Sequence, residues 1–198
     1  MSALDAAGAG DAAAPAIGPG AFVAVVGASG VGKDALMSYA RERLADGAYF
    51  PRRAITRLAG AGEDFDPLTE DGFAAAVAAG AFALSWRAHG LGYGIPVATD
   101  EHVRAGRVVV VNVSRAVLEE LGDRYERLVV VRITVSDEVR AARLHARRRE
   151  DAADIAQRLT RADPAPDFPV DAEIRNDGTL AEGGDQLLSA IASALQSA

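Results

Sequence analysis

The feature that most constrains this chain is a glycine-rich turn between an apolar run and a helical pattern. Residues Phe22–Val26 form a short apolar run of the kind that builds buried parallel strands. The turn, Gly27–Lys33, reads G-A-S-G-V-G-K and fits the pattern G-x-x-x-x-G-K, and a helical pattern continues to about Ala45. A strand, this turn and a helix in this order predict a phosphate-binding loop.

The lysine of this loop is the only lysine in the chain. The chain has 21 lysines and arginines in total, and the 20 other than Lys33 are all arginine. A position that keeps lysine in such a sequence calls for a compact ammonium group rather than a planar guanidinium. The loop glycines let backbone N–H groups turn toward a phosphate, and the helix N-terminus adds its positive end. We expect Lys33 to reach the β- and γ-phosphates of a nucleotide.

The residue after the lysine departs from the usual pattern. Loops of this kind carry Ser or Thr there, whose hydroxyl binds Mg²⁺, whereas this chain has Asp34. A carboxylate among phosphates is repelled unless a metal ion lies between them. We therefore expect Asp34 to contact Mg²⁺, directly or through water. The alternative is that Asp34 only stabilises the first helical turn and that another group binds the metal.

The rest of the chain alternates strands and helices. Val108–Val113 and Leu128–Ile133 are two more β-branched runs, and helical patterns cover about 97–105, 114–122, 136–148 and 182–196. Ser114 and Ser136 are expected N-caps. This alternation predicts an α/β fold with a mostly parallel sheet and helices on both faces.

Composition limits the functions that the chain can have. No cysteine is present, which excludes a disulfide scaffold, a thiolate metal site and a cysteine nucleophile. The net charge of −7 gives no basic footprint for nucleic acid, and no apolar run approaches the ~20 residues that span a membrane. Residues 1–20 hold almost no large apolar side chain and no signal-peptide pattern, so we expect a disordered tail before a domain at 21–198. We expect a cytoplasmic protein and leave a homodimer open.

Two segments interrupt the alternation and supply what a small-molecule kinase needs. Residues 50–96 resemble an inserted acceptor-binding subdomain, with Arg52, Arg53 and Arg57 near a short strand and Tyr93–Pro96 as a closing tight turn. Arginines and a tyrosine suit an anionic, phosphorylated acceptor. Residues 143–161 are expected to form a lid whose arginines neutralise the transferring phosphoryl group. Surface arginines and a solvated, salt-bridged helix face are the alternatives for the two segments.

Over about residues 21–195 these motifs resemble the guanylate kinase superfamily. The matching pieces are Gly27–Lys33, Thr56-Arg57, Tyr93-Gly94, the spaced pattern from Arg143 to Glu150, Ile155-x-x-Arg158-Leu159, and Asn176. The resemblance implies a three-layer P-loop kinase fold with an inserted acceptor subdomain and a helical lid. It also implies that these positions are phosphate loop, acceptor-phosphate ligands, lid arginines and a contact to the ATP base.

The guanine-reading residues of that superfamily are absent. Leu84 stands where a Glu is expected, Asn112-Val113-Ser114 replaces an Asp-x-Asp pattern, and Gly60 replaces a second arginine. A buried guanine without acceptors for its N–H groups would be rejected, so GMP is not the expected acceptor. Loss of carboxylates and the presence of Arg115 favour a more anionic acceptor.

The replacements resemble one branch of the superfamily, the ribose 1,5-bisphosphate phosphokinases. The motifs that carry this resemblance are Gly-Lys-Asp in the loop, Ile55-Thr56-Arg57, Phe82–Trp86, Ala88–Leu91, Tyr93–Pro96 and Asn112-x-Ser114-Arg115. The resemblance implies transfer of the γ-phosphoryl of ATP to a phosphorylated sugar, ribose 1,5-bisphosphate, to give 5-phosphoribosyl 1-diphosphate in phosphonate breakdown. ATP and Mg²⁺ are the implied cofactors.

The expected site residues follow from the motifs and the resemblance together. A nucleoside monophosphate kinase with unusual base recognition and a non-catalytic guanylate-kinase-like binding module remain the alternatives. The catalytic residues are expected to be Lys33, Arg143, Arg147 and Arg158. The ATP-binding residues are expected to be Gly27, Ala28, Ser29, Gly30, Val31, Gly32, Lys33, Asp34 and Asn176, and the acceptor-binding residues Arg53, Arg57, Tyr93, Asn112, Ser114 and Arg115.

Overall fold

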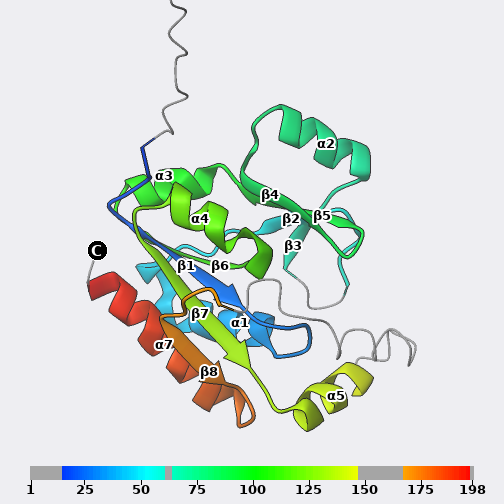
Figure 1. The fold of residues 1–198 in the computed structure, drawn as a ribbon, viewed down its shortest axis with the longest axis vertical. Coiled ribbons are helices and arrows are strands. Elements are labelled where there is room, and N and C mark those ends of the chain that lie inside the picture. The colour runs from blue at the N-terminus through cyan, green and yellow to red at the C-terminus, as the bar shows by residue number, and fades with distance from the viewer. Residues whose placement is uncertain (1–14, 61–63, 147–166, 197–198) are drawn as a thin grey trace, which may run out of the picture.

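A parallel sheet forms the centre of the computed structural model, which describes residues 15–60, 64–146 and 167–196 (Figure 1). Four strands lie in the order β6-β1-β7-β8, and every neighbouring pair is parallel. Their carboxyl ends meet at one edge, where Val25 of β1 is in register with Asn112 and Val26 with Arg132. The strands are β1 (Ala21–Val26), β6 (Val108–Asn112), β7 (Leu128–Thr134) and β8 (Ala172–Arg175).

Helices cover both faces of this sheet, as predicted. Val23 and Val25 pack with Leu36 and Leu187 from α1 (Lys33–Leu44) and α7 (Leu180–Gln196). The alternate residues of β1 pack on the other face, where Phe22 stacks on Tyr125 with ring centroids 4.7 Å apart. That face is covered by α3 (Ala98–Arg104), η2 (Arg115–Val117) and α4 (Leu118–Arg124), while α5 (Asp137–Ala146) follows β7 and η1 (Ala45–Gly47) follows α1 (Figure 1).

The ends of these elements show the expected caps. The Ser136 hydroxyl accepts a hydrogen bond from the Val139 N–H at 3.3 Å, and the Ser114 hydroxyl accepts one from the Ala116 N–H at 3.3 Å. Before β1, Ile17 pairs with Tyr125, and the Gly20 N–H donates to the Val103 carbonyl. Residues 17–20, assigned to the tail from sequence, therefore lie against the domain, while residues 1–14 lie outside the described part.

A second, smaller sheet is built from residues 53–96 and is called the small sheet below. Its order is β3-β2-β5-β4, with β2 and β3 parallel and β5 antiparallel to both β2 and β4. Thr69 caps the helix of this region, because its hydroxyl accepts a hydrogen bond from the Gly72 N–H. The elements are β2 (Arg53–Ile55), β3 (Phe65–Pro67), α2 (Glu70–Ala78), β4 (Phe82–Ala88) and β5 (Leu91–Pro96).

The prediction of a tight turn at Tyr93–Pro96 is wrong, because this segment is part of strand β5. Its neighbouring glycines allow close packing rather than a turn, because the phenyl rings of Phe73 and Phe82 lie against the backbone. A Cβ at Gly92 would stand 2.8 Å from Phe73, and one at Gly94 would stand 2.5 Å from Phe82. Among the described residues, no helix has the length and apolar character to cross a membrane.

Candidate active site

The predicted phosphate loop connects β1 to α1 and depends on its glycines. Gly27, Gly30 and Gly32 have φ values of 149°, 89° and 94°, which L side chains rarely adopt. At Gly27 a Cβ would also stand 2.3 Å from the Ile133 carbonyl oxygen. The Lys33 ammonium donates to the Gly27 carbonyl at 2.8 Å and to the Ala28 carbonyl at 3.0 Å. The Lys33 side chain therefore lies against the loop that is expected to bind phosphate.

Side chains from the other end of the fold hold the carbonyls of this loop. Asn176 is buried, and its Nδ2 donates to the Val31 carbonyl at 2.8 Å. Arg143 donates from Nη1 to the same carbonyl at 3.2 Å and from Nη2 to the Asn176 carbonyl at 2.9 Å. The Arg140 Nε donates to the Ser29 carbonyl at 3.0 Å. These bonds fix the loop conformation from α5 and from the β8–α7 connection.

Asp34 and Asn112, two departures from the guanylate kinase pattern, contact each other. The Asn112 Nδ2 donates to the Asp34 Oδ1 at 2.8 Å, although 78 residues separate them. Arg53 of β2 donates from Nη1 to the Asn112 carbonyl at 3.0 Å, and its Nη2 lies 3.9 Å from the Asp34 Oδ1. Burial lowers the pKa of the Arg53 guanidinium, and the Asp34 charge opposes that shift. This three-residue cluster, called the joint below, links α1, β6 and the small sheet.

The small sheet brings Tyr93 and Arg53 of β2 to one face. Ile55 is opposite Tyr93 in the ladder, so Arg53, two residues earlier, lies on the Tyr93 face. Tyr93 stacks on Trp86 with ring centroids 5.2 Å apart and an interplanar angle of 7°. The Arg57 guanidinium lies 4.5 Å from the centroid of the Phe65 ring, and its Nη1 donates to the Leu58 carbonyl at 3.1 Å.

A cavity of about 350 Å³ lies beside the first residues of the phosphate loop. It is bounded by residues from the loop, η2, the end of β7, α5 and β8. Its lining combines basic and acidic side chains with backbone of the loop: Gly27, Ala28, Val31, Arg115, Arg132, Ile133, Thr134, Val135, Asp137, Arg140 and Glu173.

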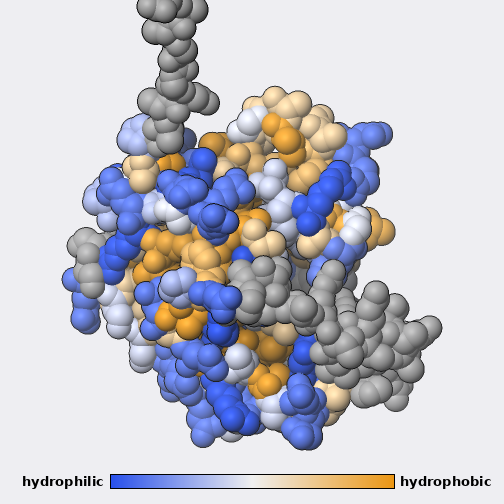
Figure 2. Space-filling view, in the orientation of Figure 1, coloured by the Kyte–Doolittle hydropathy of each residue, from blue (hydrophilic) through white to orange (hydrophobic). Residues whose placement is uncertain are grey.

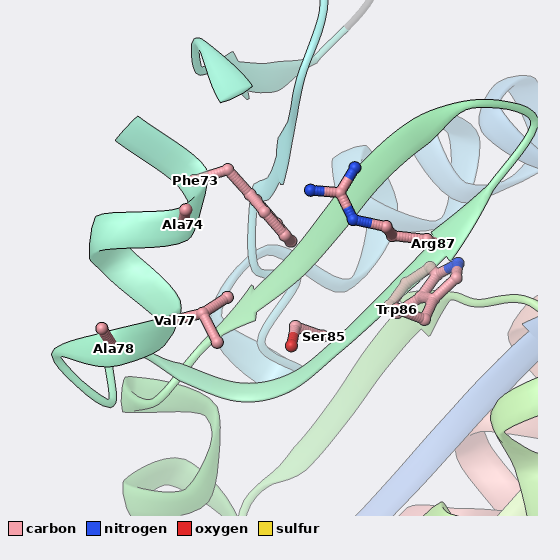
Figure 3. Close-up of a pocket in the computed structure, with 7 residues that line it drawn as sticks. All are labelled: Phe73, Ala74, Val77, Ala78, Ser85, Trp86 and Arg87. Atoms are coloured by element: carbon pink, nitrogen blue, oxygen red, sulfur yellow. The ribbon is translucent and has the colours of Figure 1, made fainter. Parts of the chain in front are cut away.

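A second hollow, of about 530 Å³, lies between α2 and β4 (Figure 3). Phe73 and Val77 of α2 form one wall, and Ser85–Arg87 of β4 form the other. The surface over α2 is also apolar, and Val77 is 45% exposed (Figure 2). No residue predicted for the site lines this hollow, so the cavity beside the loop is the better candidate.

The structure thus assembles most of the predicted residues in two groups. One group lines the cavity: Gly27, Ala28, Val31 and Arg115. The other group makes hydrogen bonds to the loop or within the joint: Lys33, Asp34, Arg143 and Asn176. The Ser114 hydroxyl caps η2. Arg147 and Arg158 lie outside the described residues, so their roles stay predictions.

Seven residues of the cavity lining were missed from sequence, and the two arginines among them are Arg132 and Arg140. Arg132 was visible as a charge inside an otherwise apolar strand, and Arg140 as an arginine one turn before Arg143. Neither signal says that the side chain faces the loop, because this depends on the register of β7 against β1.

The chemistry of Asp34 fits a hydrated Mg²⁺. Its side chain is 73% exposed, and the joint engages Oδ1. Mg²⁺ keeps several waters and commonly uses one or two carboxylates together with substrate phosphates. A cluster of three or more acidic or histidine ligands is absent from the described residues and is not required for such a site. Asp34 beside the phosphate loop is therefore a suitable ligand.

Similarity to known proteins indicates the family of this chain. No family model matches the chain. A protein of Pseudofrankia inefficax called ribose 1,5-bisphosphate phosphokinase PhnN is 67% identical over 175 residues, covering 88% of this chain and 92% of the relative. A protein of Chelativorans sp. with the same name is 47% identical over 177 residues, covering 87% and 85%.

A solved structure agrees on the fold. Guanylate kinase from Anaplasma phagocytophilum superposes with a TM-score of 0.64 and 16% identity, covering 90% of this chain and 86% of that one. At this identity the likeness concerns the fold alone, which is the guanylate kinase-like P-loop architecture predicted from sequence. Together with the two relatives, whose identity extends over most of both chains, it leads to one assignment: the chain belongs to the ribose 1,5-bisphosphate phosphokinase family.

Proposed function

We propose that this enzyme transfers the γ-phosphoryl group of ATP to ribose 1,5-bisphosphate, giving 5-phosphoribosyl 1-diphosphate and ADP. The observation that carries the proposal is an intact phosphate loop with Lys33 in a chain 67% identical to a protein named for this activity. The reaction would serve phosphonate breakdown, as the sequence resemblance implies. An ATP-dependent reaction also suits the cytoplasmic location expected from sequence.

The donor nucleotide is expected to bind at the loop. The N–H groups of Gly27–Lys33 and the N-terminus of α1 would bind its phosphates, and the Lys33 ammonium would move from the Gly27 and Ala28 carbonyls to the β- and γ-phosphates. Arg143 and Asn176 hold the Val31 carbonyl, so they would keep the loop in shape while it binds. Asn176 is also the expected neighbour of the ATP base.

Asp34 would hold Mg²⁺, directly or through water. When bound, the ion supplies charge neutralisation between the β- and γ-phosphates. The Asn112 amide fixes one carboxylate oxygen of Asp34, which leaves the exposed side of this carboxylate to face the metal. Arg53 supports the same group from the small sheet, so its expected role changes from acceptor ligand toward positioning of Asp34 and Asn112.

The acceptor is expected to lie between the small sheet and the cavity, near Arg57, Tyr93 and Arg115. An oxygen of its 1-phosphate attacks the γ-phosphorus, and the bond from that phosphorus to the β–γ bridging oxygen breaks, so ADP leaves. The attacking oxygen is already ionised at neutral pH, and no general base is needed. Positioning and charge neutralisation therefore supply the catalysis, with Arg143, Arg147 and Arg158 as the expected lid arginines.

A coupled ADP-release assay with Mg-ATP tests the proposal. Ribose 1,5-bisphosphate, GMP and no acceptor are compared at equal concentrations. We expect turnover with the sugar bisphosphate and only background with GMP, because Leu84 and Asn112 provide no carboxylate for guanine. Turnover with GMP alone would contradict the acceptor assignment, and turnover with neither would contradict the proposed function.

A further inference from the structure

The cavity beside the phosphate loop has an unusually basic lining. Three arginines reach it from three different elements: Arg115 from η2, Arg132 from β7 and Arg140 from α5. Asp137 and Glu173 oppose them, so the lining keeps a net positive charge. A cavity of about 350 Å³ with this charge is suited to a small anion.

A bound anion would explain the environment of Arg132. It is in register with Val26 at the end of β1 and with Glu173 of β8, at the carboxyl edge of the sheet. Its Nε is buried and has no hydrogen-bond partner within the described part of the chain. Burying a charged donor without a partner destabilises a fold, and a bound phosphate would provide the missing acceptor.

A buried nitrogen without a partner is not sufficient by itself to indicate an anion-binding site. Arg127, just before β7, has a buried Nη1 that also lacks a partner among the described residues. Arg127 precedes the amino end of the strand, whereas Arg132 lies near the carboxyl end and lines the cavity. The cavity and the neighbouring Arg115 and Arg140 therefore distinguish Arg132 from Arg127.

The small sheet offers less positive charge to a bisphosphate than its sequence suggests. Arg53 is bonded to the Asn112 carbonyl and lies near the Asp34 carboxylate. Arg57 donates to the Leu58 carbonyl and lies over the Phe65 ring. A bisphosphate brings two dianionic groups, and one of them needs a further set of donors.

We propose that the cavity lined by Arg115, Arg132 and Arg140 binds the phosphate of the acceptor that does not react. This inference rests on the proposed function. The cavity shares Gly27 and Ala28 with the loop, and the carbonyls of these two residues also accept from Lys33. An acceptor whose reacting phosphate lies near Lys33 would thus place its other phosphate in the cavity, across the sugar ring.

Binding of ribose 5-phosphate, which carries only the non-reacting phosphate, tests the subsite directly. Isothermal titration of the full chain and of Arg132→Met should show about 10- to 100-fold weaker binding in the variant, the range of a lost charged hydrogen bond. Arg127→Met is the matched control, since it removes an arginine just before β7 that also has one buried nitrogen without a partner among the described residues, and should bind ribose 5-phosphate as the unaltered protein does. Equal affinities in the two variants would overturn the subsite.

Steady-state kinetics separates this inference from the proposed function. With ribose 1,5-bisphosphate, Arg132→Met should raise the acceptor KM by about 10- to 100-fold, with the KM for ATP unchanged. Turnover by the unaltered protein with an unchanged acceptor KM in the variant would overturn the subsite alone. No turnover by the unaltered protein would contradict the proposed function. Thermal unfolding of Arg132→Met should show a cooperative transition as in the parent, which checks that weaker binding does not come from unfolding.

Discussion

The two sheets of this molecule differ in how they are stabilised and in what they are expected to bind. The parallel sheet is buried on both faces by helices, and all six residues of β1 are buried. The small sheet packs Phe73 and Phe82 against backbone glycines and leaves much of α2 exposed. A rigid sheet suits the phosphate loop, which needs a fixed geometry, and a smaller sheet suits an acceptor site that must admit and release a sugar.

The joint is where the two sheets meet. Asp34 follows the loop lysine, Asn112 ends β6 and Arg53 starts β2, so each sheet contributes to the position of one carboxylate. Arg53 belongs to the small sheet but is largely buried beneath it. Movement of the small sheet would therefore be transmitted to Asp34, which links acceptor binding to the expected metal site.

The largest effect is expected at the parallel sheet, from Lys33→Ala. Removing the ammonium should lower kcat by about 10³-fold, because no other lysine can neutralise the transferring phosphoryl group. The melting temperature should change by only a few degrees, since Lys33 is half-buried and lies outside the hydrophobic core of the parallel sheet. Arg43→Ala, an exposed cation at the other end of α1, is the control and should leave kcat unchanged. Activity near the parent value in Lys33→Ala would remove the loop from the mechanism.

The joint predicts that substitutions of Asp34 and Asn112 have non-additive effects on metal binding. Asp34→Ala should weaken Mn²⁺ binding to the complex with a non-hydrolysable ATP analogue by about 10-fold, measured by electron paramagnetic resonance. Asn112→Ala should weaken it less, and the double variant no more than Asp34→Ala, because Asn112 acts through the Asp34 Oδ1. Asp46→Ala, an exposed carboxylate on η1, is the control. Fully additive effects would mean that Asn112 and Asp34 act independently.

A smaller effect is expected in the small sheet alone. Gly94→Ala forces the Phe82 ring away from β5, since the new Cβ would stand 2.5 Å from it, and should destabilise the fold by about 1–3 kcal/mol. The acceptor KM should rise several-fold while the KM for ATP stays constant. Gly122→Ala in α4, whose Cβ meets only Leu128 at 4.0 Å, should be neutral or stabilising. Equal changes in both KM values would show that the two sheets do not act separately.

The smallest effect concerns stability on the α3 side of the parallel sheet. Burial and the nearby Arg107 lower the pKa of His102, which stacks on Tyr49 at 3.7 Å, below its ordinary value of 6.5. The unfolded chain therefore binds more protons at His102 than the folded chain does. The stability that neutral His102 contributes is complete above pH 6.5 and is lost as the pH falls through the folded pKa. Urea unfolding between pH 7.5 and 5 should show a smaller loss of stability in His102→Gln than in the parent. An identical pH profile would refute the role of His102.

Sequence patterns predicted β1, β6 and β7 of the parallel sheet, because these strands are nearly continuous apolar runs, and missed β8, which has four residues that alternate apolar with charged. The runs Val108–Val113 and Leu128–Ile133 correspond closely to β6 and β7. The small sheet could not be predicted strand by strand, since Arg53–Ile55 and Phe65–Pro67 are too short for a periodic pattern. Tyr93–Pro96 contains Gly and Pro, which are typical of turns, yet the rings of Phe73 and Phe82 make these glycines part of a packed strand.

The candidate site was predictable where a motif is local. Gly27–Lys33 and the unusual Asp34 are adjacent in sequence, so their spacing indicates a phosphate loop. The contact between Asp34 and Asn112 joins residues 78 positions apart and arises only when β1 and β6 pair in register. Arg132 enters the cavity through the β1–β7 register in the same way. Long-range register is not encoded in any short window, which is why these relations emerge only from the fold.

We expect this enzyme to build a diphosphate on the sugar, and phosphorus NMR detects this product directly. ATP and ribose 1,5-bisphosphate are mixed in equal amounts with catalytic protein and Mg²⁺. Two coupled diphosphate resonances should replace the acceptor 1-phosphate resonance, while the 5-phosphate resonance remains and ADP appears. Release of inorganic phosphate from ATP with both acceptor phosphates unchanged would contradict this expectation.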